Sequence, residues 1–191
     1  MKREPGTYST DVDPALAEFD RQTTPMDQFL ELVDAVHERG AKIFLDIPAN
    51  HTGWGSRLQV EHPEWFALSD DKTFRSPSAW GVTWEDLSEL DYQHVALWQW
   101  MAEVFCFWCR RGVDGFRCDA GYKVPTPVWE YIVARVRQVF PNTIFMLEGL
   151  GGPLETMEEL LDRANLDWAY SELFQNYSGS DVAHYLDYSL R

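Results

Sequence analysis

Helical and extended patterns of apolar residues alternate along this chain. Five segments have the apolar spacing of helices: 24–40, 94–111, 127–140, 154–164 and 181–190. Four short apolar runs lie between or beside them and predict strands: 41–47, 113–118, 143–149 and 166–171. Such alternation is typical of parallel β/α units whose helices cover the outer face of a sheet. We therefore expect an α/β fold with about four parallel strands and outer helices.

The first predicted helix has signals at both ends. Thr24 can cap its start, Pro25 suits its first turn and Gly40 can end it. Asp27 favours the positive end of the helix dipole. Its apolar stripe consists of Phe29, Leu32, Val33 and Val36. The run at 41–47 that follows is apolar enough to predict a buried strand.

Residues 52–93 interrupt the alternation. They are rich in Ser, Pro, Trp and acidic residues and have no sustained period, so they predict a short irregular loop domain inserted between a strand and a helix of a single domain, 1–191. Trp54, Trp80 and Trp84 in this segment could stack on flat sugar rings, and simple packing explains each at least as well.

Composition narrows the classes of partner. The formal net charge of −15 argues against nucleic acid, whose phosphates require a basic face. No apolar run approaches the roughly 18–20 residues of a membrane-spanning helix. The first ten residues contain no apolar leader segment, which predicts a cytoplasmic protein. Cys106 and Cys109 lie in an apolar helical stretch without a neighbouring His, so we expect reduced core thiols rather than a zinc site.

Polar residues follow the predicted strands at their carboxyl ends, where parallel folds place their functional groups. They are Asp46, Asn50, His51, Arg117, Asp119 and Glu148. Side chains two apart on a strand share a face, so Arg117 and Asp119 should point the same way and Cys118 the opposite way. A guanidinium beside a carboxylate favours its ionised, nucleophilic form.

Glu148 follows an apolar run that could desolvate it, and desolvation favours the protonated form that a general acid requires. Two carboxyl groups in opposite environments divide the work of glycoside hydrolysis in this way. A structural Arg–Asp pair with an unrelated Glu is the alternative, and spacing alone does not separate the two.

Three segments resemble the signature segments of the α-amylase family of retaining glycoside hydrolases (glycoside hydrolase family 13), in the family's order. They are "FLDIPANH" (44–51), "GVDGFRCDA" (112–120) and "IFMLEG" (144–149), and "DLSELDY" (86–92) resembles a shorter motif of the family's loop domain. The resemblance covers roughly residues 6–175. It implies a partial (β/α)₈ TIM barrel that supplies about the third to the sixth strand.

The resemblance also implies roles for single residues. Asp119 would be the nucleophile and Glu148 the acid and then the base, with Arg117 orienting Asp119. His51 would hydrogen-bond the sugar, and Asp46 would be a structural acid at the strand ends.

Other positions of the resemblance concern the loop domain and the leaving-group side of the cleft. Asn50 would support the loop domain, in many relatives through calcium, although no cofactor is required for the reaction. Tyr122 and Lys123 stand where many α-amylases have Lys and His, so the leaving-group side and the specificity should differ.

The family barrel has eight strands, and nothing here resembles the segment that carries its third catalytic acid. We therefore expect the chain to be a piece of a longer enzyme, with little or no activity by itself unless the rest of a barrel completes it.

Four functions remain open from the sequence. Hydrolysis of starch or maltooligosaccharides is the leading hypothesis, and transglycosylation by the same residues is the nearest alternative. A non-catalytic carbohydrate-binding or scaffold relative should have lost Asp119 or Glu148, and both are present. A metal-dependent hydrolase using Asp46, His51 and Asp119 would lack the clustered His ligands typical of such sites.

Overall fold

The computed structural model describes residues 24–79, 81–150, 153–170 and 178–189. Its main sheet has four parallel strands in the order β1-β6-β7-β8. The strands are β1 (Phe44–Pro48), β6 (Gly115–Asp119), β7 (Ile144–Leu147) and β8 (Trp168–Ala169). This confirms the expected α/β fold with four parallel strands and the architecture of a partial TIM barrel.

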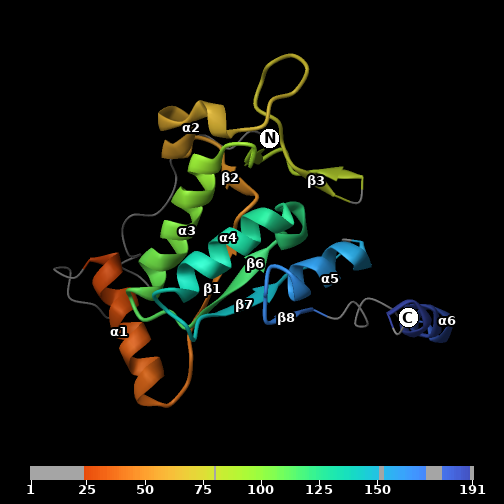
Figure 1. Cartoon of the computed structure of the whole chain (residues 1–191). Helices are drawn as coiled ribbons and strands as arrows, with labels where there is room; N and C mark the ends of the chain where they lie inside the picture. The colour runs from red at the N-terminus through yellow and green to blue at the C-terminus, as the bar shows by residue number, and fades with distance from the viewer. Residues whose placement is uncertain (1–23, 80, 151–152, 171–177, 190–191) are drawn as a thin grey trace, which may run out of the picture.

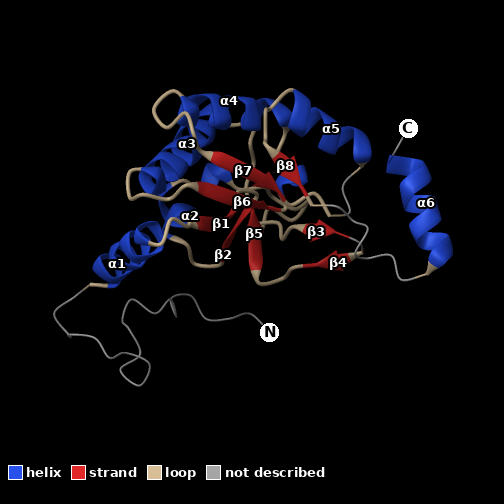
Figure 2. Ribbon diagram, turned by 90° about the horizontal axis from the view of Figure 1, so that it is seen from below, coloured by secondary structure: helices blue, strands red, loops and turns tan. Residues whose placement is uncertain are grey.

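Helices cover one face of this sheet. The helices of the described chain are α1 (Pro25–Glu38), α2 (Arg57–Glu61), α3 (Val95–Cys109), α4 (Thr126–Arg137), α5 (Leu154–Asp162) and α6 (Gly179–Ser189), with short 3-10 turns η1 (Pro63–Trp65) and η2 (Gly121–Lys123). Figure 2 shows α3, α4 and α5 arching over the same side of the strands. The outer face of the sheet is therefore the buried one.

Aromatic packing joins α3 and α4 to the sheet. The Phe105 ring of α3 meets the Phe116 ring of β6 edge-on at 4.7 Å, and it lies 5.6 Å from Phe145 of β7 and 6.0 Å from Trp129 of α4. All four side chains are fully buried. Because Phe116 points to the helices, the two-residue alternation of β6 turns Arg117 to the opposite, inner face.

Local signals set the ends of α1 as the sequence predicts. Thr24 and Asp27 form a reciprocal capping box, and Gly40 follows the helix at φ +69°, in the left-handed region. The predicted apolar stripe is only partly buried: Val33 is 2% exposed, whereas Leu32 is 53% exposed. Part of the stripe thus faces solvent.

The prediction that the first strand is buried is wrong. Leu45 and Ile47 are half-buried, and Asp46 and Pro48 are exposed. β1 is partly exposed because it is an edge strand: among the described strands it pairs only with β6. Gly115 lets this edge approach closely, since a Cβ there would lie 2.4 Å from the Phe44 ring.

The segment expected to be irregular contains short elements and lies above the carboxyl ends of the sheet (Figure 1). It contains α2 and η1, and its strands are β2 (His51–Gly53), β3 (Ser78–Ala79), β4 (Val82–Thr83) and β5 (Leu87–Glu89). β2 and β5 form an antiparallel ribbon. The Leu90 N–H donates to the Asn50 carbonyl at 2.9 Å, and the Tyr92 hydroxyl donates to the Ala49 carbonyl. These bonds hold the segment against the end of β1.

The three cysteines are buried free thiols, and burial raises the pKa of each thiol. This confirms the expectation of reduced core thiols for Cys106 and Cys109. In the described part of the chain, no helix combines the length and the apolar character needed to cross a membrane.

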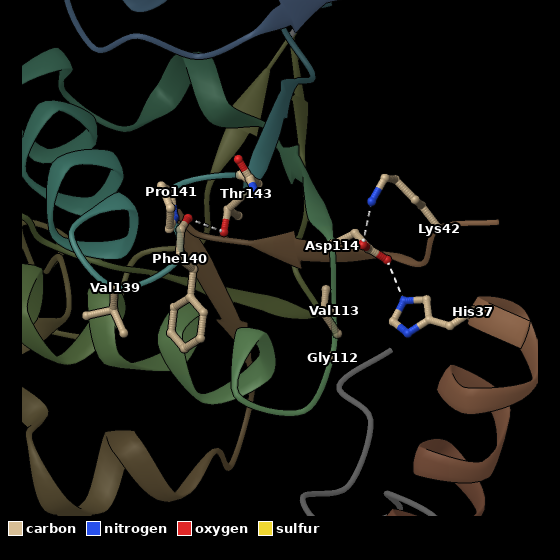
Figure 3. Close-up of a pocket in the computed structure, with 10 residues that line it drawn as sticks. His37, Lys42, Gly112, Val113, Asp114, Val139, Phe140, Pro141 and Thr143 are labelled. Carbon is tan, nitrogen blue, oxygen red and sulfur yellow. Dashed lines mark hydrogen bonds and ion pairs between the residues drawn. The ribbon is translucent and has the colours of Figure 1, made fainter. Parts of the chain in front are cut away.

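An aspartate at the amino end of β6 ties three parts of the fold together. Asp114 accepts hydrogen bonds from Lys42 Nζ at 2.8 Å and from the Ile43 N–H at 2.9 Å, and His37 Nε2 lies 2.8 Å from the same carboxylate. Figure 3 shows Lys42 and His37 converging on Asp114 at the rim of a pocket of about 390 Å³. Burial acts to raise the pKa of Asp114, but these partners outweigh it and lower the pKa below its ordinary value of 3.8.

We expect Asp114→Ala to destabilise the fold by about 1–3 kcal/mol, because it leaves the Ile43 N–H without its acceptor. Urea unfolding followed by circular dichroism measures the change, with the exposed Asp70→Ala as control. Since the folded-state pKa of Asp114 is depressed, its stabilisation is full above pH 3.8 and lost as the pH falls through the folded-state value. A difference between wild type and Asp114→Ala that persists unchanged at pH 2 would contradict this account.

Candidate active site

β6 presents an arginine between two carboxylates on the inner face of the sheet. Arg117 Nη1 lies 2.7 Å from Asp119 Oδ1 and 2.7 Å from both carboxylate oxygens of Asp46. The parallel register explains this, because Asp46 of β1 is paired with Arg117. Burial acts to lower the pKa of Arg117, but the hydrogen bonds from the two aspartates outweigh it and raise the pKa further. The predicted contact of Arg117 with Asp119 is thus confirmed.

Glu148 follows β7 and is 6% exposed. Its Oε2 accepts the Ala120 N–H at 2.7 Å, and its Oε1 accepts the Leu150 N–H at 3.1 Å. Ala120 has φ +46° and ψ 36°, a left-handed conformation that a non-glycine residue rarely adopts. The turn after Asp119 therefore aims a backbone donor at the Glu148 carboxyl, and this fixes its orientation.

The environment of Glu148 favours its protonated form. Desolvation is the largest influence and raises the pKa above the ordinary value of 4.5. The two backbone donors act to lower the pKa, and the neighbouring charge of Asp119 raises it. The net shift is upward, which is the direction that a general acid needs.

β2 and its partner β5 place a histidine at the same rim. His51 Nδ1 lies 2.5 Å from Asn50 Oδ1, and the ring is partly buried. Desolvation lowers the pKa of His51, and this outweighs the charges of Asp119 and Asp86, which act to raise it. The ring is therefore predominantly neutral at neutral pH and can hydrogen-bond a polar ligand without adding a charge.

These groups meet in one cavity of about 450 Å³, within the range of small-molecule sites. Its lining residues come from the ends of β6 and β7 and from the loop segment: His51, Trp84, Asp86, Leu87, Arg117, Asp119, Ala120, Tyr122, Glu148 and Leu150. Both carboxyl groups predicted to do the chemistry thus open onto the same space, with Arg117 beside one of them.

Four predicted site residues do not line this cavity: Asn50, Asp46, Trp54 and Lys123. Asp46 is joined to it only through Arg117. The Trp54 indole N–H donates to the Glu85 carbonyl at 2.7 Å, and the Lys123 ammonium donates to the Ser78 carbonyl. The last two side chains therefore hold the loop segment, while Trp84 is the described tryptophan at the cavity. Trp80 lies outside the described residues.

Sequence reasoning missed several residues of the site. Asp86 and Leu87 belong to the quoted "DLSELDY" stretch, but nothing in their spacing singled them out. Ala120 was missed because alanine carries no signal for a left-handed turn. Tyr170, just beyond β8, places its ring centroid 5.8 Å from the Arg117 guanidinium carbon, in cation–π range.

Calcium at Asn50 stays a prediction. The Asn50 side-chain oxygen faces His51, and the described chain holds no group of three or more His, Cys, Asp or Glu side chains arranged for a metal. Arg117 also lies between Asp46 and Asp119, so this arrangement does not support a metal-dependent hydrolase built on those two acids.

Comparison with known proteins supports both the fold and the resemblance of the three quoted segments to the α-amylase family. The family model of the alpha-amylase catalytic domain matches residues 18–144. An alpha-1,4-glucan:maltose-1-phosphate maltosyltransferase of Rhodospirillum rubrum is 30% identical over 85% of this chain and 24% of its own length. One from Pseudomonas aeruginosa is 28% identical over 83% of the chain and 24% of its own length. The chain thus spans about a quarter of the length of these curated relatives.

Among solved structures, an alpha-amylase from Lactobacillus plantarum matches 83% of this chain with 40% of its own, with a TM-score of 0.68 and 31% identity. An alpha-amylase from Geobacillus thermoleovorans complexed with acarbose matches 94% of this chain with 42% of its own, with a TM-score of 0.67; at 18% identity it supports the fold alone. Family model, relatives and folded structure agree, and the chain belongs to the alpha-amylase family.

Proposed function

We propose that this chain carries the catalytic pair of an enzyme that acts on α-glucans by double displacement, with Asp119 as nucleophile and Glu148 as acid and base. One observation carries the proposal: Asp119, Arg117 and Glu148 line a single cavity at the carboxyl ends of two adjacent parallel strands. Carboxyl groups on opposite faces of the sheet could not share a substrate.

Each step of the proposed reaction is assigned to a residue of the cavity. Asp119 attacks the anomeric carbon while Glu148 gives its proton to the departing glycosidic oxygen, and a covalent glycosyl-enzyme forms. Arg117, bonded to Asp119 at 2.7 Å, orients that carboxylate for the attack. Glu148 then removes a proton from the incoming hydroxyl, which attacks the same carbon and releases the Asp119 carboxylate. Two inversions give a product with the configuration of the substrate.

His51 and Trp84 complete the sugar site in this proposal. The largely neutral His51 ring can exchange hydrogen bonds with a sugar hydroxyl, and the Trp84 ring lines the cavity where an apolar sugar face could pack. The substrate class follows from relatives whose names include alpha-1,4-glucan and maltose, and from an alpha-amylase solved with acarbose.

Whether water or a sugar hydroxyl takes the glycosyl group is a separate question. Hydrolysis is the function we place first, by analogy with the alpha-amylase structures. Transglycosylation is the second candidate, because the relatives compared above are maltosyltransferases. The same residues serve both, since the acceptors compete for one intermediate.

Proton NMR tests the proposal on the 191-residue chain completed by a second chain that supplies the other strands of the barrel, because we expect little or no activity from the 191 residues alone. The activity measurements below use the same complex. With maltotetraose as substrate, we expect the α-anomer of the new reducing end to appear before mutarotation. With excess glucose, longer products would indicate transfer, and their absence would indicate hydrolysis. Appearance of the β-anomer first would contradict double displacement. A completed barrel that binds maltotetraose but never releases product would support a carbohydrate-binding relative instead.

A further inference from the structure

The guanidinium of Arg117 is held through a single nitrogen. Its Nη1 donates to Asp119 Oδ1 and to both carboxylate oxygens of Asp46, each at 2.7 Å. Within the described residues, these are the hydrogen bonds that the Arg117 side chain makes. Bonds at one nitrogen fix the position of that atom but leave the plane of the group free to turn about it. A contact with the flat face of the guanidinium would restrict that rotation.

Tyr170 supplies such a contact. Its ring centroid lies 5.8 Å from the Arg117 guanidinium carbon, within the range of a cation–π contact. The strand order β1-β6-β7-β8 places Asp46 on one side of Arg117 and Tyr170 on the other. Arg117 is therefore held from both sides of its own strand, by a carboxylate on the first and by an aromatic ring on the second.

Strand register explains how Tyr170 reaches Arg117 across β7. Arg117 is paired with Met146, and Met146 is paired with Trp168 of β8. Tyr170 lies two residues beyond Trp168, so it shares a face with that residue and stands one pleat closer to the carboxyl ends of the strands. The backbone holds it there, because the Tyr170 N–H donates to the Leu147 carbonyl at 3.3 Å.

We infer that Tyr170 is a positioning residue of the reaction, which acts through Arg117 on the Asp119 carboxylate. The ring restricts rotation of the guanidinium, and the guanidinium holds Asp119 at 2.7 Å in the orientation for attack. Tyr170 does not line the cavity, so its effect should be on the rate of glycosyl transfer and not on the binding of sugar. The inference rests on the proposed function and adds a residue that none of the quoted segments contains.

Glycosyl transfer to Asp119 in the completed barrel tests the inference. A 5-fluoro-α-glucosyl fluoride forms the glycosyl-enzyme and slows its breakdown, so mass spectrometry of the intact chain follows the rate of labelling. We expect Tyr170→Leu to lower the rate at saturating fluoride by about 2- to 30-fold, which corresponds to the loss of one cation–π contact. The fluoride concentration that gives half of the maximal rate should change by less than about twofold, because binding is untouched.

Two substitutions serve as controls. Tyr170→Phe keeps the ring and removes only the hydroxyl, so it should label within about twofold of wild type. Tyr131→Leu removes the same kind of side chain from α4, where it packs beside Trp98, and should leave the rate unchanged. Circular dichroism shows whether each variant folds. If Tyr170→Leu does not fold, Tyr170→Met takes its place, because it fills more of the space and carries no aromatic face.

A double-mutant cycle separates positioning from structural support. Arg117→Met removes the cation that the ring contacts, and it should itself slow labelling. In that background Tyr170→Leu should cause no further loss, because the group on which it acts is gone. Equal losses in the presence and absence of Arg117 would show that Tyr170 supports the fold alone, and would overturn the inference.

The outcomes distinguish the inference from the proposed function. If wild type labels at Asp119 and Tyr170→Leu labels as fast, the inference fails and the proposed function stands. Labelling of Tyr170→Phe as slow as that of Tyr170→Leu would assign the effect to the hydroxyl and would also overturn the inference. If the completed wild-type barrel never labels at Asp119, the proposed function fails, and the inference fails with it.

Discussion

Asp119→Asn is expected to remove turnover by on the order of 10⁴-fold or more, because the amide cannot form the covalent glycosyl-enzyme. A 5-fluoro-α-glucosyl fluoride gives a direct measurement, since its activated leaving group lets the intermediate form while the ring fluorine slows its breakdown. Mass spectrometry of the intact chain should show one added glycosyl group, and peptide mapping should place it on Asp119. The Asp119→Asn variant should show no added mass.

Asp46→Asn is the matched control. The Asp46 carboxylate also lies 2.7 Å from Arg117 Nη1, but Asp46 does not line the cavity. The substitution therefore removes a partner of Arg117 and leaves the carboxyl groups of the cavity in place. We expect this variant to label more slowly, by roughly 10- to 100-fold, because Arg117 loses one of the two anchors that orient it. Labelling of Asp46 instead of Asp119, or loss of labelling equal to that of Asp119→Asn, would contradict the assignment.

The difference expected between these two aspartates follows from strand register. Asp46 is paired with Arg117, and Pro48 is paired with Asp119, so Asp119 lies one pleat closer to the carboxyl ends of the strands. Catalytic groups in parallel folds collect at those ends. Asp46 lies one pleat further from those ends, where it bonds to Arg117 and does not line the described cavity.

The face that each β6 residue occupies could be predicted from sequence because the side-chain period of a strand is fixed. Arg117 and Asp119 share a face and Cys118 is buried on the other, as the two-residue rule requires. The ends of α1 were equally predictable, since Thr24 and Asp27 bond to each other's backbone locally. Features that depend on residues only a few positions apart can be predicted from the sequence without knowledge of the tertiary structure.

Features that depend on distant contacts could not be predicted in this way. The burial of β1 depends on what pairs with it, and an apolar run does not show that the strand lies at an edge. The left-handed Ala120 is fixed by the hydrogen bond of its N–H to Glu148, 28 residues away. Asp86 reaches the cavity because the loop segment folds back over the sheet, which spacing along the chain does not encode.

Glu148→Gln is expected to slow the cleavage of maltotetraose by about 10²–10⁴-fold, because the amide cannot give a proton to the leaving glycosidic oxygen. A glycosyl fluoride needs much less of that proton, since fluoride is a far better leaving group. The rate of glycosyl-enzyme formation from the fluoride should therefore fall by less than about tenfold. A much larger loss of rate with maltotetraose than with the fluoride identifies Glu148 as the general acid, because damage to binding or folding would lower both rates together.

The same variant has a pH signature. Burial raises the folded-state pKa of Glu148, so its acid form persists above the ordinary pKa of 4.5. The cleavage rate should therefore fall with rising pH only above pH 4.5, and this fall is the alkaline limb of the pH profile. In Glu148→Gln this limb should disappear while the remaining slow rate stays flat. A limb that survives the substitution would assign the titration to another group.

The charge of Asp119 explains how one carboxyl could serve as acid and then as base. After desolvation and the two backbone donors, the Asp119 carboxylate is a further influence on Glu148 and raises its pKa. When Asp119 becomes a glycosyl ester its charge disappears, so the pKa of Glu148 should fall just when a base is needed. Azide, which needs no base, should then restore turnover of the fluoride by Glu148→Gln and yield the α-glycosyl azide. A β-azide product would show that the sugar never passed through a covalent intermediate on Asp119.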